Sequence, residues 1–185
     1  NIAKHNGSLL DPMCGSGTIP VEAGLIACRI PPGKFRNFFG FMRWRDYDEI
    51  LFDKVKKESD SRIIEMPVRI AAVDISEQAI RQAAQNINNA GLSGDIIMEV
   101  SDFKDINSTD DYGFLVFNPP YGERLKPDEI DELYKMIGTT LKHNFAGYKA
   151  WIITSGKEFL KNIGLRPKAK YLLYNVAIEC TLAGY

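Results

Sequence analysis

The stretch DPMCGSGT, residues 11–18, follows a short apolar segment and precedes a stretch with helical periodicity. The apolar segment, residues 8–10, is expected to be a β-strand that ends at Asp11. Ile19, Ala23 and Ile26 then recur with the spacing of one helix face. Two glycines separated by one residue let the backbone pass close to a ligand, and the start of a helix offers free N–H groups. The stretch therefore predicts a ligand-binding turn, although a tight turn without a ligand would fit the same residues.

Two phosphate-binding patterns do not fit this turn. Pro20 stands where the dinucleotide-binding pattern GxGxxG requires its third glycine, and the Lys-Ser/Thr pair of a P-loop is absent. The next acidic residue at a predicted strand end is Asp74, 57 residues after Gly17, whereas a dinucleotide site has it about 20 residues on.

Short apolar runs alternate with helical patterns along the chain, which indicates parallel strands joined by helices. Ser76 is expected to cap a second helix that Gly91 ends, and a third helix is expected to begin at residues 127–129. The closing run, residues 171–182, is expected to form an antiparallel hairpin with part of residues 163–170. The remaining predicted strands are residues 69–73, 96–100, 114–117 and 150–154.

The composition excludes several classes of protein. With 185 residues, 45% hydrophobic content and a net charge of −1, the chain fits one globular domain and is too apolar for a disordered protein. No apolar run reaches the roughly 18 residues of a membrane-spanning helix, so no membrane partner is expected. The three cysteines form no CxxC pair, which argues against a disulfide framework and favours the reducing cytoplasm. Two histidines are too few for a histidine-based metal site.

The start of the chain bears on its organisation. The first residue is Asn, and a predicted strand follows almost at once. We interpret residues 1–185 as a single domain, a fragment of a longer protein that lacks an N-terminal region. A monomer is the expected state of this fragment. Because positive charge is not in excess, the domain is not expected to hold nucleic acid by bulk charge alone.

Acidic residues follow two of the predicted strands. Asp74 ends the strand at 69–73, and Asp102 follows the strand at 96–100. Ligands of open α/β sheets bind at the carboxyl ends of the strands. A carboxylate after the second strand can accept hydrogen bonds from both hydroxyls of a ribose, and one after the third can accept from an adenine amine. Asp74 could also merely precede a capped helix, but the glycine turn favours the binding role.

The sequence NPPYGER, residues 118–124, directly follows the apolar strand at 114–117. Two prolines stiffen this loop and remove two N–H donors. The groups that remain are the amide oxygen of Asn118, a proline carbonyl and the ring of Tyr121. Such a loop accepts hydrogen bonds from an –NH2 group and stacks on a flat ring. It therefore predicts a site for the exocyclic amine of a base or for an amide.

Taken together, these motifs resemble those of class I S-adenosylmethionine-dependent methyltransferases that act on amino groups. More narrowly, they are similar to RNA guanine-N2 methyltransferases that carry an N-terminal THUMP domain, among them the bacterial 23S rRNA enzymes. NPPY alone also occurs in DNA amino-methyltransferases and in glutamine methyltransferases of release factors, but NPPYGER together with DPMCGSGT is narrower. The resemblance covers essentially the whole chain, through DPMCGSGTIPVEA (11–23), FFGFMRWRDYD (38–48), VDIS (73–76), SDF (101–103), NPPYGERL (118–125) and KAKYLLYNVAIEC (168–180).

The resemblance implies a Rossmann-like fold with a mostly parallel seven-stranded sheet and an antiparallel C-terminal hairpin. It also implies roles for the matching positions. Asp74 would bind the cofactor's ribose, and Ile75, Asp102 and Phe103 would bind its adenine. Asn118, Pro119, Pro120 and Tyr121 would hold the target base, and Asn118 would also contact the cofactor. The methionine half of S-adenosylmethionine would be lined by Asp11, Pro12, Cys14, Gly15, Ser16, Gly17 and Thr18.

Residues 30–66 interrupt the alternation of strands and helices and are expected to be an insertion. Tyr47, Ile50, Leu51 and Val55 give this segment a helical pattern of its own. Basic and aromatic residues interleave at its start, a combination that suits unpaired RNA. A small satellite core with a solvated basic rim is the alternative for the aromatic residues. The arginines expected to contact RNA are Arg36, Arg43 and Arg45, with Arg124 of the NPPYGER loop.

These observations predict an enzyme that methylates N2 of a guanosine in 23S ribosomal RNA. A tRNA guanine-N2 methyltransferase is the nearest alternative. DNA adenine methylation and protein glutamine methylation are more distant alternatives, and a module that binds RNA or cofactor without catalysis belongs to another class.

Overall fold

The computed structural model describes residues 7–108, 110–120 and 127–185. The strands are β1 (Ser8–Asp11), β2 (Ile70–Asp74), β3 (Ile96–Val100), β4 (Gly113–Phe117), β5 (Lys149–Thr154), β6 (Ala169–Asn175) and β7 (Ile178–Gly184). The α-helices are α1 (Thr18–Ala27), α2 (Glu49–Asp60), α3 (Glu77–Asn89) and α4 (Pro127–His143). Three 3₁₀ helices are η2 (Gly40–Arg43), η3 (Phe103–Asp105) and η5 (Lys157–Ile163).

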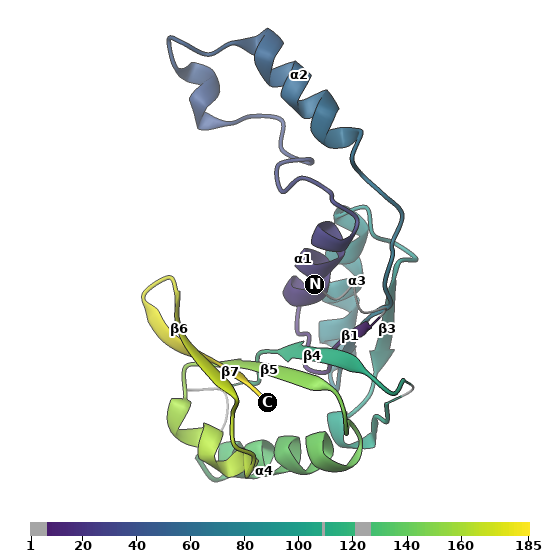
Figure 1. Cartoon of the computed structure of the whole chain (residues 1–185), viewed down its shortest axis with the longest axis vertical. Coiled ribbons are helices and arrows are strands. Elements are labelled where there is room, and N and C mark those ends of the chain that lie inside the picture. Colours follow the sequence, from purple (N-terminus) through teal and green to yellow (C-terminus); the bar gives the residue numbers. More distant parts are fainter. Residues whose placement is uncertain (1–6, 109, 121–126) are drawn as a thin grey trace.

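The strands form one seven-stranded sheet in the order β3-β2-β1-β4-β5-β7-β6 (Figure 1). β1 to β5 pair in parallel, and β7 pairs antiparallel with both β5 and β6. The predicted α/β class, the mostly parallel sheet and the antiparallel C-terminal pair are therefore confirmed.

Helices cover both faces of the sheet and create two apolar cores. On one face, α4 packs Ile130, Tyr134 and Ile137 against Leu115 and Phe117 of β4. On the other, α1 and α3 cover the β1–β3 side, where the core contains Leu9, Ile70, Ala72, Ala83, Ile87, Leu92 and Ile96. These side chains alternate along the strands, as expected for a sheet buried on both faces.

The second predicted helix has the caps that its sequence indicates. Ser76 accepts a hydrogen bond from the backbone N–H of Ala79, and Ser76 is the N-cap of α3. Gly91 follows the helix with φ 68°, a left-handed conformation that glycine adopts without a steric penalty. Both predicted ends of this helix are confirmed.

The face that α1 buries differs from the predicted one. Ile26 was expected on the core side, but it is 75% exposed, and the buried residues of α1 are Pro20 and Gly24. A Cβ at Gly24 would lie 2.7 Å from Leu92 Cδ1, so the absence of a side chain there allows this close approach. Val21, Ala23 and Leu25 still pack against the core, so the predicted periodicity fails at Ile26 and holds at Ala23.

The C-terminal hairpin also differs from the prediction. Its turn lies inside the run 171–182, at residues 176–177 between β6 and β7, and most of residues 163–170 precede the hairpin. Val176 at the turn has φ 57° and is 96% exposed. Asn175, directly before the turn, was the one local signal of it, because asparagine favours turns, whereas Val176 and Ala177 do not.

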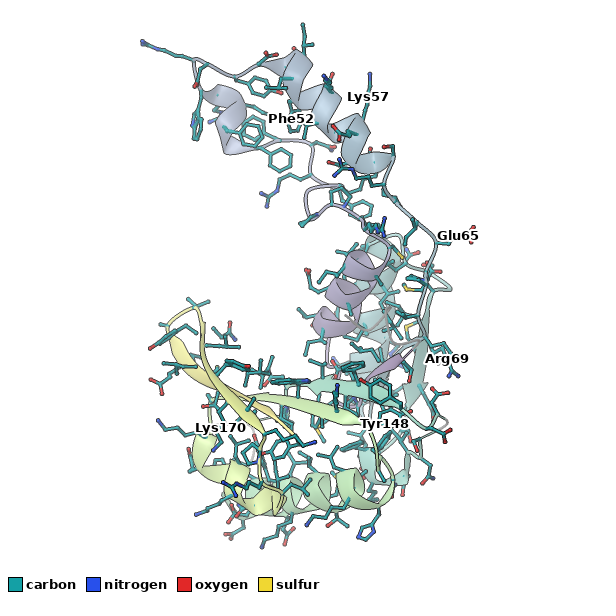
Figure 2. The ribbon with its side chains drawn as sticks, in the orientation of Figure 1. Phe52, Lys57, Glu65, Arg69, Tyr148 and Lys170 are labelled. Atoms are coloured by element: carbon teal, nitrogen blue, oxygen red, sulfur yellow. The ribbon has the colours of Figure 1, made fainter. Side chains whose placement is uncertain are left out.

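The segment between α1 and β2 extends away from the sheet (Figure 1). Its helical pattern corresponds to α2, but Ile50 and Leu51 are exposed at 84% and 56%. Figure 2 shows Phe52 between α2 and η2, where the centroid of its ring lies 5.6–6.1 Å from those of Phe39, Phe41 and Tyr47. The segment thus has a small aromatic core of its own, while much of its apolar surface faces outward.

In the part of the chain that the structure describes, none of the helices combines the length and apolar character needed to cross a membrane. Within the same residues, no three potential ligands from His, Cys, Asp and Glu gather to hold a metal ion. The three cysteines are free and buried.

Candidate active site

A cavity of about 1200 Å³ lies at the carboxyl ends of the parallel strands. It spans the neighbouring strands β1 and β4, from which the chain continues to opposite sides of the sheet. This is the topological switch point at which open α/β sheets bind their ligands. Two groups of the lining residues are called here the turn wall (residues 11–16, 18, 74, 75, 102 and 103) and the hairpin wall (residues 153, 173–175, 178 and 180), and further lining residues include Asn118, Pro119 and Pro120.

Backbone and side-chain hydrogen bonds hold the turn wall in place. The N–H of Gly15 donates to Asp74 Oδ2, and the N–H of Ser76 donates to Asp74 Oδ1, both at 2.9 Å. Asn86 of α3 donates from Nδ2 to the Ser16 carbonyl at 2.8 Å. Asp74 therefore joins the glycine turn after β1 to the start of α3, in addition to facing the cavity.

The two glycines of the turn have different roles. Gly15 has φ 54° and lines the cavity, with nothing within 4 Å of the position that a Cβ would take. Gly17 has φ 81°, and a Cβ there would lie 3.0 Å from Ala83 Cβ. Gly17 does not line the cavity, and its predicted contact with the cofactor stays a prediction. It lets the turn pack closely on α3.

Asp11 is a buried carboxyl group in the turn wall. It is 1% exposed, and its Oδ1 accepts a hydrogen bond from the N–H of Met13 at 3.1 Å. Burial raises its pKa from 3.8 to about 7, the Met13 hydrogen bond works against this shift, and the charge of Asp74 adds to it. Asp11 is thus poised to change charge near neutral pH.

Cys14 is an unreactive thiol in this wall. Burial, with the nearby charges of Asp11 and Asp74, raises the pKa of its thiol to about 12. The nucleophilic form of cysteine is the thiolate, so Cys14 stays protonated and packs as a small apolar side chain. A covalent mechanism through this cysteine is not supported.

At the end of β3, Asp102 and Phe103 complete the turn wall. Asp102 accepts from the backbone N–H of Lys104 at 3.2 Å and pairs with Lys104 Nζ at 2.9 Å. This pairing, above all the side-chain hydrogen bond, lowers the pKa of Asp102. Phe103 is 2% exposed and packs edge-on against Phe117. The wall therefore presents an ionised carboxylate beside a firmly held ring.

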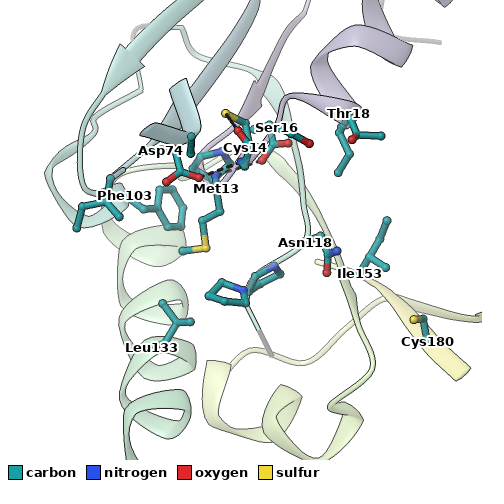
Figure 3. A pocket seen from close by; sticks show the side chains of 18 of the residues that line it. Met13, Cys14, Ser16, Thr18, Asp74, Phe103, Asn118, Leu133, Ile153 and Cys180 are labelled. Carbon is teal, nitrogen blue, oxygen red and sulfur yellow. Dashed lines mark hydrogen bonds between the residues drawn. The ribbon is translucent and has the colours of Figure 1, made fainter. Parts of the chain in front are cut away.

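After β4, the chain turns along the cavity through Asn118, Pro119 and Pro120. Figure 3 shows Asn118 between Asp74, Met13 and Phe103 on one side and Ile153 and Cys180 on the other. Asn118 is exposed, Pro119 is buried, and the amide of Asn118 has no hydrogen bond with another described residue. The Oδ1 oxygen and the Nδ2 amino group of its side chain are therefore available to a ligand. The predicted residues Tyr121 and Arg124 lie outside the described residues.

The structure brings most of the predicted site residues together around this one cavity. They are Asp11, Pro12, Cys14, Gly15, Ser16, Thr18, Asp74, Ile75, Asp102, Phe103, Asn118, Pro119 and Pro120. Arg36, Arg43 and Arg45 do not line the cavity and lie in the segment beyond α1.

Sequence reasoning missed the hairpin wall. Its residues come from β5, β6 and β7, more than 130 positions after the glycine turn, and are Ile153, Leu173, Tyr174, Asn175, Ile178 and Cys180. The segment KAKYLLYNVAIEC (168–180) carries part of the family resemblance, but no binding role was predicted for any of its residues. The available signal was the unusual apolar and aromatic content of a hairpin at the sheet edge, which is expected to be polar on its exposed face.

Comparison with known proteins gives consistent matches over the whole chain. The family model for the RMKL-like methyltransferase domain matches residues 3–184. A ribosomal RNA large subunit methyltransferase K/L of Allochromatium vinosum is 40% identical over 100% of this chain and 26% of its own length. The protein of the same name from Methylococcus capsulatus is 39% identical over 98% of this chain and 25% of its own length. The chain thus spans about a quarter of the length of these curated relatives.

Two solved structures share the fold at a TM-score of 0.89. The protein SMU.472, crystallised with SAH, is 29% identical and is matched over 97% of this chain and 48% of its own. A protein of Clostridium difficile 630 is 34% identical, with the same two coverages. The sheet and helices of this chain are therefore arranged as in these two proteins. One of the two, SMU.472, holds SAH, the product that S-adenosylmethionine leaves after methyl transfer.

Proposed function

Because the chain belongs to the family of RMKL-like methyltransferase domains, we propose that it transfers a methyl group from S-adenosylmethionine to N2 of a guanosine in 23S ribosomal RNA. The names of its relatives and the SAH in a similar structure support the substrate class and the cofactor. The observation that carries the proposal is the position of Asn118 and Pro119, which face the same cavity as the glycine turn.

The turn wall fits S-adenosylmethionine through its set of hydrogen-bonding groups. Each Asp74 oxygen accepts one backbone hydrogen bond and keeps a further lone pair, so the carboxylate can still accept from the two ribose hydroxyls. We assign Ile75, Asp102 and Phe103 to the adenine. The open position at Gly15, with the other turn residues and Thr18, is assigned to the methionine half. When bound, the cofactor supplies an electrophilic methyl group on its sulfonium.

Asn118 and Pro119 orient the nucleophile in this proposal. The lone pair of guanine N2 is delocalised into the ring and attacks poorly. If Asn118 Oδ1 and the Pro119 carbonyl accept the two N–H groups of the amine, they localise the lone pair and aim it at the methyl group. The proton can leave after transfer, so no strong general base is needed. We assign to Tyr121 the stacking of its ring on the flipped base.

RNA contacts beyond the target base are assigned to the segment between α1 and β2. The guanidinium of Arg36 lies 5.5 Å from the centroid of the Phe39 ring, and that of Arg43 lies 5.0 Å from the Phe38 ring. Both arginines are exposed, as is Arg45. Arginine planes held on rings can stack on unpaired bases and reach phosphates. Arg124 is assigned the same role on sequence alone.

We further propose that a longer protein supplies an RNA-capture region, since the domain has no excess of positive charge. Three buried, free cysteines fit a reducing cytoplasm, and the domain alone is proposed to be monomeric. Sedimentation of the purified chain tests the last point.

The test of function combines binding with product identification. Calorimetry should show binding of S-adenosylmethionine to the purified chain. Tritiated-methyl transfer should then label 23S rRNA, and nucleoside mass spectrometry should identify N2-methylguanosine. Parallel reactions with tRNA, duplex DNA and protein separate the alternatives. Cofactor binding without labelling of rRNA by either the chain or its full-length form would overturn the proposal.

A further inference from the structure

The β6–β7 hairpin exposes more apolar surface than an edge of a sheet normally does. Its exposed apolar residues are Tyr171 (56%), Leu172 (58%), Leu173 (40%), Tyr174 (66%), Val176 (96%) and Ile178 (49%). β6 is the last strand of the sheet, so its outer edge has no neighbouring strand among the described residues. Soluble proteins usually protect such edges with charge or proline. A hairpin that is apolar on both faces therefore indicates a binding surface.

This surface is continuous with the active-site cavity. Leu173, Tyr174 and Ile178 belong both to the exposed surface of the hairpin and to the cavity lining. A cavity of about 1200 Å³ also exceeds the roughly 300–1,000 Å³ of a typical small-molecule site. The hairpin wall therefore bounds the part of the cavity that lies beyond the cofactor groups of the turn wall.

The stretch of chain that leads into and forms the hairpin is rich in positive charge. Residues 157–180 contain five Lys or Arg and two Glu, a balance of +3 in a chain whose net charge is −1. Lys157 pairs with Glu179 at 3.3 Å, which leaves four cations without an ion pair to any other described residue: Lys161, Arg166, Lys168 and Lys170. All four are exposed, and Figure 2 shows Lys170 at the base of the hairpin. The segment with α2 has a weaker balance, with eight basic and seven acidic residues at 30–66.

We propose that the β6–β7 hairpin binds the single-stranded RNA next to the target nucleotide, with Tyr174 stacking on a neighbouring base. This inference rests on the proposed function and adds to it a second binding surface. Exposed aromatic rings beside unpaired cations are the combination that holds single-stranded nucleic acid, because rings stack on bases and cations neutralise phosphates. A protein partner would not require the positive balance, and a membrane surface would not require continuity with the catalytic cavity.

The test measures RNA binding and does not depend on methyl transfer. A fluorescein-labelled single-stranded RNA of about ten nucleotides, with one central guanosine, is titrated with the protein in the presence of SAH, and anisotropy is recorded. Tyr174→Ala should weaken binding about 10-fold or more, the effect of losing one stacked base. Tyr174→Trp should restore it. Tyr171→Ala is the matched control, because Tyr171 is an exposed tyrosine of the same strand that stacks on Trp151 and does not line the cavity.

Salt dependence gives a second, independent measurement. Replacing Lys168 and Lys170 with Gln should make the slope of log K against log salt less steep by about 1.4, which corresponds to two lost phosphate contacts on a single strand. Calorimetry with SAH should give the wild-type affinity for every variant, because none of these residues is in the turn wall.

Three outcomes would overturn the inference. They are no RNA binding by the wild-type protein, wild-type RNA affinity in Tyr174→Ala, or a wild-type dimer that dissociates in Tyr174→Ala while RNA binding is unchanged. The last result would assign the hairpin to contacts between copies of the chain. If the wild type binds RNA through Tyr174 but methylates no RNA, the inference stands and the proposed function fails.

Discussion

The two walls of the active-site cavity are built in different ways. The turn wall is tied together by hydrogen bonds from Gly15, Ser76 and Asn86, and its ring at Phe103 is 2% exposed. The hairpin wall consists mainly of apolar side chains, several of them exposed, and Val176 at the turn of the same hairpin has a strained φ of 57°. One wall is already organised before any ligand binds, and the other has unsatisfied apolar surface.

This difference fits a division of labour between the walls. Preorganised polar groups suit a small cofactor of fixed shape, since binding then requires little ordering. An exposed apolar edge with nearby cations suits a long, flexible substrate that covers it on binding. We therefore expect variants in the turn wall to change cofactor affinity, variants in the hairpin wall to change substrate affinity, and variants between the walls to change turnover.

The largest expected effect is at Asn118, between the walls. Asn118→Ala should lower kcat about 10²-fold or more, because it removes a preorganised acceptor for the target amine, worth roughly 2.7–4 kcal/mol in the transition state. Asn118→Asp should lose less activity, since a carboxylate still accepts hydrogen bonds. Single-turnover methyl transfer at saturating RNA and cofactor measures this effect.

Asn175→Ala is the matched control for this prediction, because Asn175 is an asparagine of the hairpin wall that lines the same cavity. It should change KM for RNA more than kcat. Near-normal turnover in a folded Asn118→Ala protein would show that the NPPY sequence is only a structural turn.

The difference between the walls also explains what the sequence could predict. The turn wall and the loop at Asn118 are built from short motifs at strand ends, where local sequence determines local structure, so Asp11, Asp74 and Asn118 could be recognised and placed together. The hairpin wall depends on which residues of β6 and β7 pair, and a run whose one turn-forming residue is Asn175 specifies this register only weakly. The packing face of α1 was missed for a related reason, because Gly24 is buried by the proximity of Leu92 and not by its own hydrophobicity.

The second prediction concerns Asp74 in the turn wall. Asp74→Ala should weaken S-adenosylmethionine binding by about 1.5–3 kcal/mol, the range for hydrogen bonds to a charged group. Because Asp74 also accepts from Gly15 and Ser76, the variant should in addition lower the melting temperature of the protein. Calorimetry and thermal unfolding measure the two effects.

Glu77→Ala is the matched control for Asp74→Ala. It also removes one negative charge, but from an exposed residue that pairs with Arg81, so it should leave the affinity for the cofactor unchanged. RNA binding by Asp74→Ala in the absence of cofactor should match the wild type. A parallel loss of RNA affinity would mean that the two walls are not independent.

The third prediction is a pH dependence that belongs to the turn wall. Asp11 has a pKa of about 7 in the folded protein and 3.8 as its ordinary value. Between these values the folded state holds a proton that the unfolded state has lost, so stability falls as pH rises, by at most about 1.4 kcal/mol per pH unit. Below about pH 4 and above about pH 7 the contribution of Asp11 to the slope disappears.

Urea unfolding between pH 5 and pH 8 measures this slope, and Asp11→Asn should flatten it. Asn keeps an oxygen that can accept from the N–H of Met13, so the hydrogen bond is preserved while the ionisable group is removed. Glu77→Gln, on the surface of α3, should leave the slope as it is in the wild type. Identical slopes for Asp11→Asn and the wild type would show that Asp11 is already ionised at pH 5.

The smallest expected effect is at the turn of the hairpin. Val176 is a β-branched residue with φ 57°, a conformation that costs an L-residue roughly 1–2 kcal/mol and costs glycine almost nothing. Glycine loses more conformational entropy on folding, by roughly 0.5–1 kcal/mol, so Val176→Gly should raise the free energy of unfolding of the hairpin by about 0.5–1 kcal/mol. Arg29→Gly is the comparison, because Arg29 has the same φ of 57° at the end of α1, away from the cavity lining.

If the hairpin unfolds separately from the sheet, Val176→Gly should slow amide exchange in β6 and β7 without changing the midpoint of global unfolding, whereas Arg29→Gly should shift that midpoint. A lower stability of Val176→Gly in both measurements would mean that the apolar side chain of Val176 already packs in the folded protein, and the contrast between an organised turn wall and an uncovered hairpin wall would then be wrong.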